Sequence, residues 1–253
     1  MAPVIMLGGG LVAPDSIASL TGWWKAESLG LADGTEIDEW DDEQGPYTFL
    51  DGGATAKPLY KTSIINGRPV VRFDGVNDYM FGDIGDHTLD TLINNDAGTI
   101  MSAQNVTNIG TDSATAVNNE ATWASGTTGD YVGTYLRSSG TVFGSNYDTN
   151  GDHAAHLVDA EGAWSCITWM HGGGNVYSGI DDTRTASLTS LASGNTHATP
   201  MAGILRLGRP FSNAFYLEYD LAEICFFDTA LSEADRQTVE RWFANRYSIT
   251  LPY

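Results

Sequence analysis

The run richest in oxygen ligands is the acidic corner Asp74-Gly75-Val76-Asn77-Asp78. Its two carboxylates and one amide lie close together in the chain, and calcium prefers oxygen groups of this kind. Calcium takes about six to eight oxygens, so backbone carbonyls or other loops would have to complete the site. The alternative is a turn held by hydrogen bonds from the backbone to Asp74 and Asn77. The sequence thus suggests calcium as a cofactor, with Asp74, Asn77 and Asp78 as candidate ligands, and leaves the structural turn open.

A second acidic run, from Asp148 to Asp159, begins with the carboxylate spacing of an EF-hand loop. His153 stands where such a loop needs glycine, and Asp159 stands where it needs glutamate. His153 and His156 would ligate a metal only if a third ligand converged on them. This run is therefore a weak candidate for a cation, and surface residues are the preferred interpretation.

The run Glu36-Ile37-Asp38-Glu39 begins like the catalytic strand of a retaining glycoside hydrolase. Such a strand needs two carboxyls about 5 Å apart on one face, and strand side chains share a face every second residue. Trp40 and Asp41 follow where the second glutamate would be needed. We therefore predict no catalytic residue and expect a non-enzymatic protein.

Aromatic residues in the polar middle of the chain are candidates for carbohydrate binding. A ring can stack on the apolar face of a sugar while its polar group stays in contact with water. The candidates are Trp123, Tyr131, Tyr135 and Tyr147. The alternative is that these rings cover the core beneath long loops.

Short strands are the elements that would position these residues. Runs of β-branched and aromatic residues between glycine-rich and polar turns predict strands. The predicted strands are 20–26, 37–40, 70–73, 79–81, 99–103, 131–136, 141–143, 164–170, 176–180, 204–208 and 219–227. The last of these is apolar on both faces apart from Glu223, so we expect it to be covered on both sides.

A helix is predicted at the C-terminal end. Ser232 and Asp235 resemble the N-cap and the third position of a capping box. Val239, Trp242, Phe243 and Tyr247 then follow at spacings that place them on one helical face. We expect this helix to pack against the strands.

The composition describes one acidic globular domain. The 253 residues include 12 Lys and Arg against 32 Asp and Glu, for a formal net charge of −20. This charge repels phosphate backbones and anionic lipid surfaces, so we expect neither nucleic-acid binding nor membrane insertion. Cys166 and Cys225 lie in apolar strand-like runs, which favours two buried free thiols over a disulfide.

The N-terminal segment 1–16 is apolar, glycine-jointed and without Lys or Arg. A signal peptide has a basic start and a longer apolar core, so we expect none here. Such an arm can dock onto a neighbouring subunit, and a frayed terminus is the alternative. We expect residues 17–253 to form a single domain.

Four local patterns carry a resemblance to a known family. They are Gly22-Trp23-Trp24-Lys25-Ala26, Trp40-Asp41-Asp42-Glu43-Gln44-Gly45, residues 67–79, and residues 221–232 with the helix that follows. The chain thereby resembles the concanavalin A-like, laminin G-type jelly-roll domains of phage virion and bacterial surface proteins. The resemblance implies two antiparallel sheets and a role in glycan binding, adhesion or virion architecture. Residues 102–160 match no pattern of that family.

The resemblance and the arm together imply a phage virion structural protein, either a capsid decoration, a fibre or a tail-associated protein. Its localisation would be the virion, after synthesis in the host cytoplasm. Its partners would be other virion subunits through the arm, copies of itself in a homo-oligomer, and a glycan of the host surface. The alternatives are a free or cell-surface lectin or adhesin module and, less favoured, a glycoside hydrolase.

Overall fold

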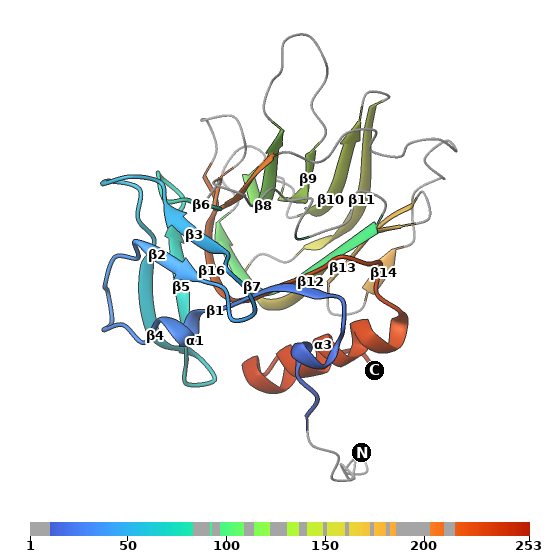
Figure 1. Ribbon diagram of the computed structural model, residues 1–253, viewed down its shortest axis with the longest axis horizontal. Coiled ribbons are helices and arrows are strands. Elements are labelled where there is room, and N and C mark those ends of the chain that lie inside the picture. Colours follow the sequence, from blue (N-terminus) through green and yellow to red (C-terminus); the bar gives the residue numbers. More distant parts are fainter. Residues whose placement is uncertain are drawn as a thin grey trace.

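The computed structural model describes residues 11–82, 92, 97–108, 114–121, 131–136, 141–148, 151–159, 162–172, 175–180, 183–185, 203–209 and 216–253. Within these residues the chain folds into two antiparallel eight-stranded sheets that face one another, with a C-terminal helix beneath one of them (Figure 1). The prediction of an all-β sandwich with a C-terminal helix is confirmed.

Sheet A has the strand order β14-β13-β12-β7-β16-β5-β4, and β1 pairs with β16. Its strands are β1 (Leu20–Lys25), β4 (Leu59–Ile65), β5 (Arg68–Asp74), β7 (Ala97–Asn108), β12 (Trp164–Gly172), β13 (Asn175–Ile180), β14 (Thr183–Thr185) and β16 (Glu218–Phe227). Two short helical segments adjoin it, η1 (Pro14–Ser16) and α1 (Ala26–Leu29). The sequence had not predicted either of them.

Sheet B has the strand order β11-β10-β9-β8-β15-β6-β3-β2. Its strands are β2 (Glu39–Asp41), β3 (Thr48–Asp51), β6 (Met80–Gly82), β8 (Ala114–Ala121), β9 (Tyr131–Leu136), β10 (Thr141–Asp148), β11 (Gly151–Asp159) and β15 (Gly203–Leu207). The middle of the chain, which matched no family pattern, therefore supplies half of this sheet. The predicted hairpin between residues 131–136 and 141–143 is confirmed, because β9 pairs with β10.

The core has two layers, and β16 lies between them. One layer fills the space between the sheets, with Trp24, Phe73 and Phe226 fully buried. The other lies between sheet A and the helix α3 (Glu233–Tyr247), where Cys225 and Phe243 are fully buried. The prediction that this strand is covered on both faces is thus confirmed, as are the two buried free thiols.

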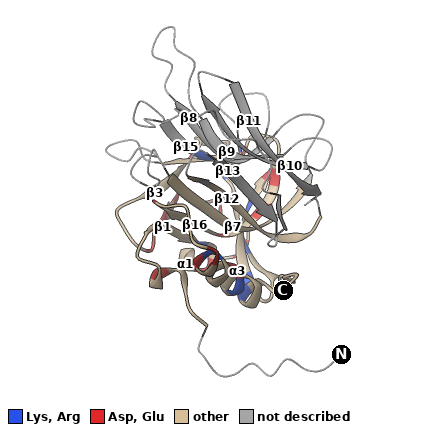
Figure 2. Ribbon diagram, turned by 90° about the vertical axis from the view of Figure 1, so that its right-hand side faces the viewer, with Lys and Arg blue, Asp and Glu red and all other residues tan. Residues whose placement is uncertain are grey.

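Helix α3 begins where the capping pattern predicted. The backbone N–H of Asp235 donates to the Ser232 hydroxyl oxygen at 3.2 Å, and the hydroxyl donates to Asp235 Oδ2 at 2.7 Å. Ser232 is therefore the N-cap, and Asp235 accepts from its hydroxyl, whereas the glutamate of a capping box accepts from the N-cap backbone N–H. Figure 2 shows α3 beneath sheet A, with acidic and basic residues along it. Among the described residues no helix is long and apolar enough to span a membrane.

The predicted N-terminal arm is described only in its last residues. Residues 1–10 lie outside the described part of the chain. Pro14 is buried, and η1 packs against α3. This end of the arm therefore contacts the domain itself.

Candidate functional site

The acidic corner at the end of β5 is a hydrogen-bonded turn. Asp74 Oδ1 accepts from the backbone N–H groups of Val76, Asn77 and Asp78 at 2.8, 3.1 and 3.2 Å. Asp78 Oδ2 in turn accepts from the Asp74 N–H at 3.0 Å. The Asn77 side-chain amide donates to the Thr55 carbonyl. These are the bonds of the structural turn that the sequence left open, and they engage all three candidate calcium ligands.

The described part of the chain holds no cluster of three or more His, Cys, Asp or Glu side chains that could bind a metal ion. Calcium binding by Asp74, Asn77 and Asp78 stays a prediction. A rise in melting temperature on adding calcium, abolished by Asp78→Asn, would establish it.

The two carboxylates of the corner differ in environment, because Asp78 is buried and Asp74 is exposed. Burial and, to a smaller extent, the nearby charges of Asp74 and Glu36 raise the pKa of Asp78 from its ordinary value of 3.8 to about 7, against the opposing effect of the hydrogen bond from the Asp74 N–H. At neutral pH the folded protein therefore carries an Asp78 carboxyl that is only partly ionised.

Stability should depend on pH through Asp78. The folded state holds the Asp78 proton more tightly than the unfolded chain, so the free energy of unfolding should fall as pH rises from about 4 to about 7. The shift corresponds to about 4 kcal/mol at most. Asp78→Asn keeps an oxygen acceptor for the Asp74 N–H and should raise stability at pH 7.5 while flattening this dependence. Urea unfolding at pH 4.5 and 7.5 measures both effects.

The control for this pH effect is Glu39→Gln, which removes one exposed carboxylate from sheet B. It should leave the difference in stability between pH 4.5 and 7.5 close to that of the wild type. An Asp78→Asn variant with the same pH dependence as the wild type would show that another group carries it.

Three of the four candidate sugar-binding residues come together on sheet B. Tyr131 on β9 is the direct cross-strand partner of Tyr147 on β10, and Tyr135 is the partner of Phe143. Alternate residues of a strand share a face, so all four positions lie on one face of the two strands. Trp123, the fourth candidate, lies outside the described residues.

The register also shows which face of sheet B this is. One row of paired residues crosses the sheet through Leu50, Phe81, Arg206, Asn118, Gly133 and Ser145. Their strand neighbours Phe49, Met80, Leu205 and Leu207 are buried in the core between the sheets. The row therefore lies on the side away from sheet A, which we call the outward face of sheet B. Since Tyr131 and Tyr135 flank Gly133, and Tyr147 lies two residues from Ser145, the tyrosine positions belong to the outward face.

An aromatic group with an arginine lies at the β6 end of the same face. The ring centroid of Tyr79 is 6.3 Å from that of Phe81 and 6.5 Å from that of Tyr216. The Arg209 guanidinium carbon lies 4.2 Å from the Tyr79 ring centroid. These four half-buried residues, the Tyr79 cluster, are anchored by the Tyr79 hydroxyl, which donates to the Gly52 carbonyl at 2.8 Å. The Tyr79 cluster therefore adds aromatic side chains to the face of sheet B that carries the tyrosine positions.

The remaining candidate residues, for catalysis and for metal binding, do not form a common site. Glu36 is exposed and forms only an isolated bridge with Leu59. The run from Asp148 to Asp159 forms the β10–β11 hairpin, so the EF-hand interpretation is wrong. On β11, His153 and His156 are three residues apart and pair with Asn146 and Phe143 of β10, so the two positions lie on opposite faces of the strand.

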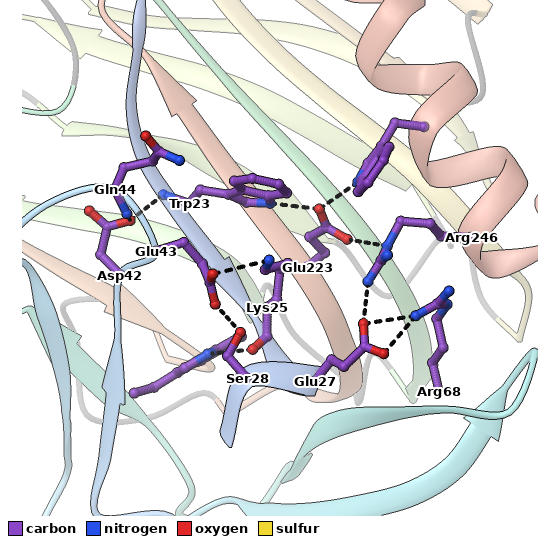
Figure 3. Close-up of polar contacts among 12 residues, drawn as sticks. Trp23, Lys25, Glu27, Ser28, Asp42, Glu43, Gln44, Arg68, Glu223 and Arg246 are labelled. Atoms are coloured by element: carbon purple, nitrogen blue, oxygen red, sulfur yellow. Dashed lines mark hydrogen bonds and ion pairs between the residues drawn. The ribbon is translucent and has the colours of Figure 1, made fainter. Parts of the chain in front are cut away.

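A buried polar centre holds α3 against sheet A (Figure 3). Glu223 on β16 has no exposed side-chain surface. Its Oε1 accepts from the indole N–H groups of Trp23 and Trp242 at 2.6 and 2.8 Å. Its Oε2 accepts from the Tyr247 hydroxyl at 2.5 Å and from Arg246 Nε at 3.2 Å. Burial raises the pKa of Glu223, and the four donors oppose that rise without cancelling it.

The polar centre continues to the surface through Arg246. Arg246 also pairs with Glu27 of α1, and both Glu27 oxygens accept from Arg68 at 2.8 Å (Figure 3). Every group in this chain of contacts has a protein partner, and Glu223 is inaccessible to a ligand. We therefore assign it to the attachment of α3 and not to a binding site.

The residues that the sequence did not single out are those of the Tyr79 cluster together with Arg206. Tyr79 and Arg209 are far apart in the chain and meet only because β6 pairs with β15. A signal was present in the alternation of Leu205, Arg206 and Leu207, which predicts one polar position on a strand with two apolar neighbours. The partner of that position does not follow from the alternation.

Known structures share this fold at low sequence identity. No protein-family model and no curated protein matches the sequence. A sialidase from Trypanosoma rangeli, solved in complex with sialic acid, is 10% identical with a TM-score of 0.64, covering 94% of this chain and 34% of the sialidase. The binding domain of botulinum neurotoxin serotype D is 12% identical with a TM-score of 0.64, covering 91% of this chain and 53% of that structure. The same neurotoxin domain in complex with N-acetylneuraminic acid is 11% identical, with the same TM-score and coverage.

At these identities the likeness shows an all-β sandwich fold and nothing finer. The chain spans about a third of the sialidase and about half of the neurotoxin binding domain.

Proposed function

We propose that this protein is a non-enzymatic, glycan-binding β-sandwich whose binding surface is the outward face of sheet B. One observation carries the proposal: the register brings Tyr131, Tyr135 and Tyr147 to one face of two adjacent strands. Aromatic rings on a common face can stack on the apolar faces of successive sugars. The Tyr79 cluster supplies further rings on the same side.

The fold comparisons support this use of the scaffold. Two of the similar structures, the sialidase and the neurotoxin domain, are complexes with a sialic acid. Because these proteins are only 10–11% identical to this chain, its ligand and binding surface must be inferred from its own residues. The four sequence patterns resemble those of concanavalin A-like, laminin G-type domains, and this resemblance also supports a glycan-binding sandwich.

Within this proposal the protein is a component of a phage virion, where such a face would meet a host glycan. The support is the resemblance to virion jelly-roll domains and the apolar segment 1–16. Mass spectrometry of purified particles should find the chain there. Its absence from particles would favour the free or cell-surface lectin instead.

Removal of either of the paired tyrosines should weaken sugar binding. On a glycan array, screened with and without calcium, the wild type should bind a defined set of glycans. Tyr131→Ala and Tyr147→Ala should each weaken binding to those glycans by about 3- to 10-fold, because each loses one stacking ring. Dissociation constants from calorimetry measure the loss.

Tyr253→Ala is the matched control, since it removes an exposed tyrosine beyond α3, on the far side of sheet A. It should bind as the wild type does. A wild-type chain that binds no glycan with or without calcium would contradict the proposal. For the weaker candidate, a glycoside hydrolase, any observed hydrolysis that Glu36→Gln leaves unchanged would remove Glu36, the only nucleophile that the sequence offered for it.

A further inference from the structure

Aromatic positions flank a row of small residues on the outward face of sheet B. The row of paired residues that defines this face passes through Gly133 of β9 and Ser145 of β10. Two residues to either side of it lie two aromatic cross-strand pairs: Tyr131 with Tyr147, and Tyr135 with Phe143. Positions two apart share a face, so both pairs belong to the face of the row. Because glycine has no side chain and serine a short one, a ligand can cross these two strands along the row with aromatic positions on both sides.

The same row leads to an aromatic ring on β6. From β9 it continues through Asn118 and Arg206 to Phe81. The Phe81 ring is half-buried, and its centroid is 6.3 Å from that of Tyr79. Tyr79 is engaged by the protein itself, because its hydroxyl donates to the backbone and Arg209 stacks on its ring. Within the Tyr79 cluster, Phe81 is therefore the better candidate for contact with a ligand.

The strand order determines how far apart the two aromatic ends are. Strands β8 and β15 lie between β9 and β6, so Phe81 is three strand spacings from β9 and four from β10. At about 4.8 Å per spacing, these separations are about 14 and 19 Å. One sugar of an extended β-1,4-linked chain covers about one such spacing. A ligand that contacts both ends therefore needs about four or five sugars.

The charge of the protein limits the kind of sugar. The chain has a formal net charge of −20, and a field of this sign disfavours polyanions. The row itself ends on β2 at Glu39, an exposed carboxylate that pairs with Leu50. The hydroxyl groups of a neutral sugar are not repelled by these charges. The surface therefore favours a neutral chain.

We propose that the outward face of sheet B binds an extended, neutral, linear glycan of about four or five sugars, which crosses the strands from β10 to β6. The tyrosines of β9 and β10 contact one end of the glycan, and the Phe81 ring stacks on a sugar at the other end. This inference rests on the proposed glycan-binding function and specifies the length and direction of its ligand.

Calorimetry on the full chain tests the inference with β-1,4-linked ladders of glucose, N-acetylglucosamine and mannose, from one to six sugars. For at least one ladder, affinity should rise by about 3- to 10-fold from the trisaccharide to the pentasaccharide and then stay level, because only the longer chain reaches Phe81. Phe81→Ala should remove this rise and leave binding of the trisaccharide unchanged. Phe81→Tyr keeps a ring at this position and should keep the rise.

The matched control is Tyr253→Ala, which removes an exposed ring beyond α3. This variant should show the full rise with chain length. Unchanged binding of the trisaccharide shows that Phe81→Ala remains folded. Phe81→Leu removes the ring with a smaller loss of volume, and it should lose the rise as well.

The outcomes separate the inference from the function beneath it. Tyr131 and Tyr135 are about 14 Å apart along β9, so a glycan lying along that strand would have a similar length. A rise that persists in Phe81→Ala would therefore overturn the direction proposed here. Full affinity for a mono- or disaccharide, or binding of array glycans without any ladder, would also overturn the inference and leave glycan binding in place. Binding of no ladder, together with an empty glycan array, would overturn both.

Discussion

Glu223→Ala should destabilise the fold more than the loss of any exposed charge. The substitution leaves the indole N–H groups of Trp23 and Trp242, the Tyr247 hydroxyl and the Arg246 guanidinium without their common acceptor. Breaking a buried charged pair by removing one partner costs about 3–5 kcal/mol. For a domain of this size the melting temperature should fall by roughly 6–20 °C. Calorimetry and urea unfolding measure the change.

Glu27→Ala is the matched control, because Glu27 is the other carboxylate that Arg246 binds and about half of its side chain is exposed. Its loss should cost about 1 kcal/mol or less, as exposed ion pairs do. Glu223→Gln should fall between the two variants. It keeps one oxygen acceptor but turns an N–H group toward other donors. If Glu223→Ala cost no more than Glu27→Ala, apolar packing would hold α3, and the polar centre would be secondary.

The polar centre shows what sequence patterns predict and where they stop. The predicted strand 219–227 and the predicted helix are both confirmed, because apolar runs and helical spacing report local structure. Glu223 stood out as the one charged residue in that strand. Its donors come from β1 and from two turns of α3, so only the packing of distant segments identifies them. A charged residue in a doubly covered strand indicates a buried polar centre without naming its partners.

The candidate site was likewise predicted only in part from the sequence. The aromatic residues of β9 and β10 could be predicted from composition, and a hairpin between the strands was predicted as well. Their arrangement on one face depends on the register between β9 and β10, which the sequence did not predict. The acidic corner at Asp74 was predicted with its two alternatives; hydrogen bonds to the backbone confirm the turn, and calcium binding stays a prediction. The arginines were not predicted, because Arg209 reaches Tyr79 only across the β6–β15 pair.

Gly208→Ala should be the most damaging single-methyl change near the candidate site. Gly208 lies between Leu207 of β15 and Arg209, with φ at +87°, a conformation that side chains rarely adopt. A Cβ there would lie 2.6 Å from Cδ1 of the buried Phe73 and 2.9 Å from the backbone oxygen of Asp78. Backbone strain of about 1–2 kcal/mol and overpacking of about 1–3 kcal/mol should together lower the free energy of unfolding by about 2–5 kcal/mol.

Gly34→Ala separates the two causes, because Gly34 has φ at +79° and open space where its Cβ would be. It carries the strain without the overlap and should cost only about 1–2 kcal/mol. Urea unfolding of both variants gives the difference, and equal costs would show that the core around Phe73 yields to the added methyl. Relief of the overlap would have to move either the acidic corner or the end of β15. Since β15 belongs to the sheet whose outward face we propose as the glycan-binding surface, Gly208→Ala should also weaken glycan binding at temperatures where it stays folded, whereas Gly34→Ala should not.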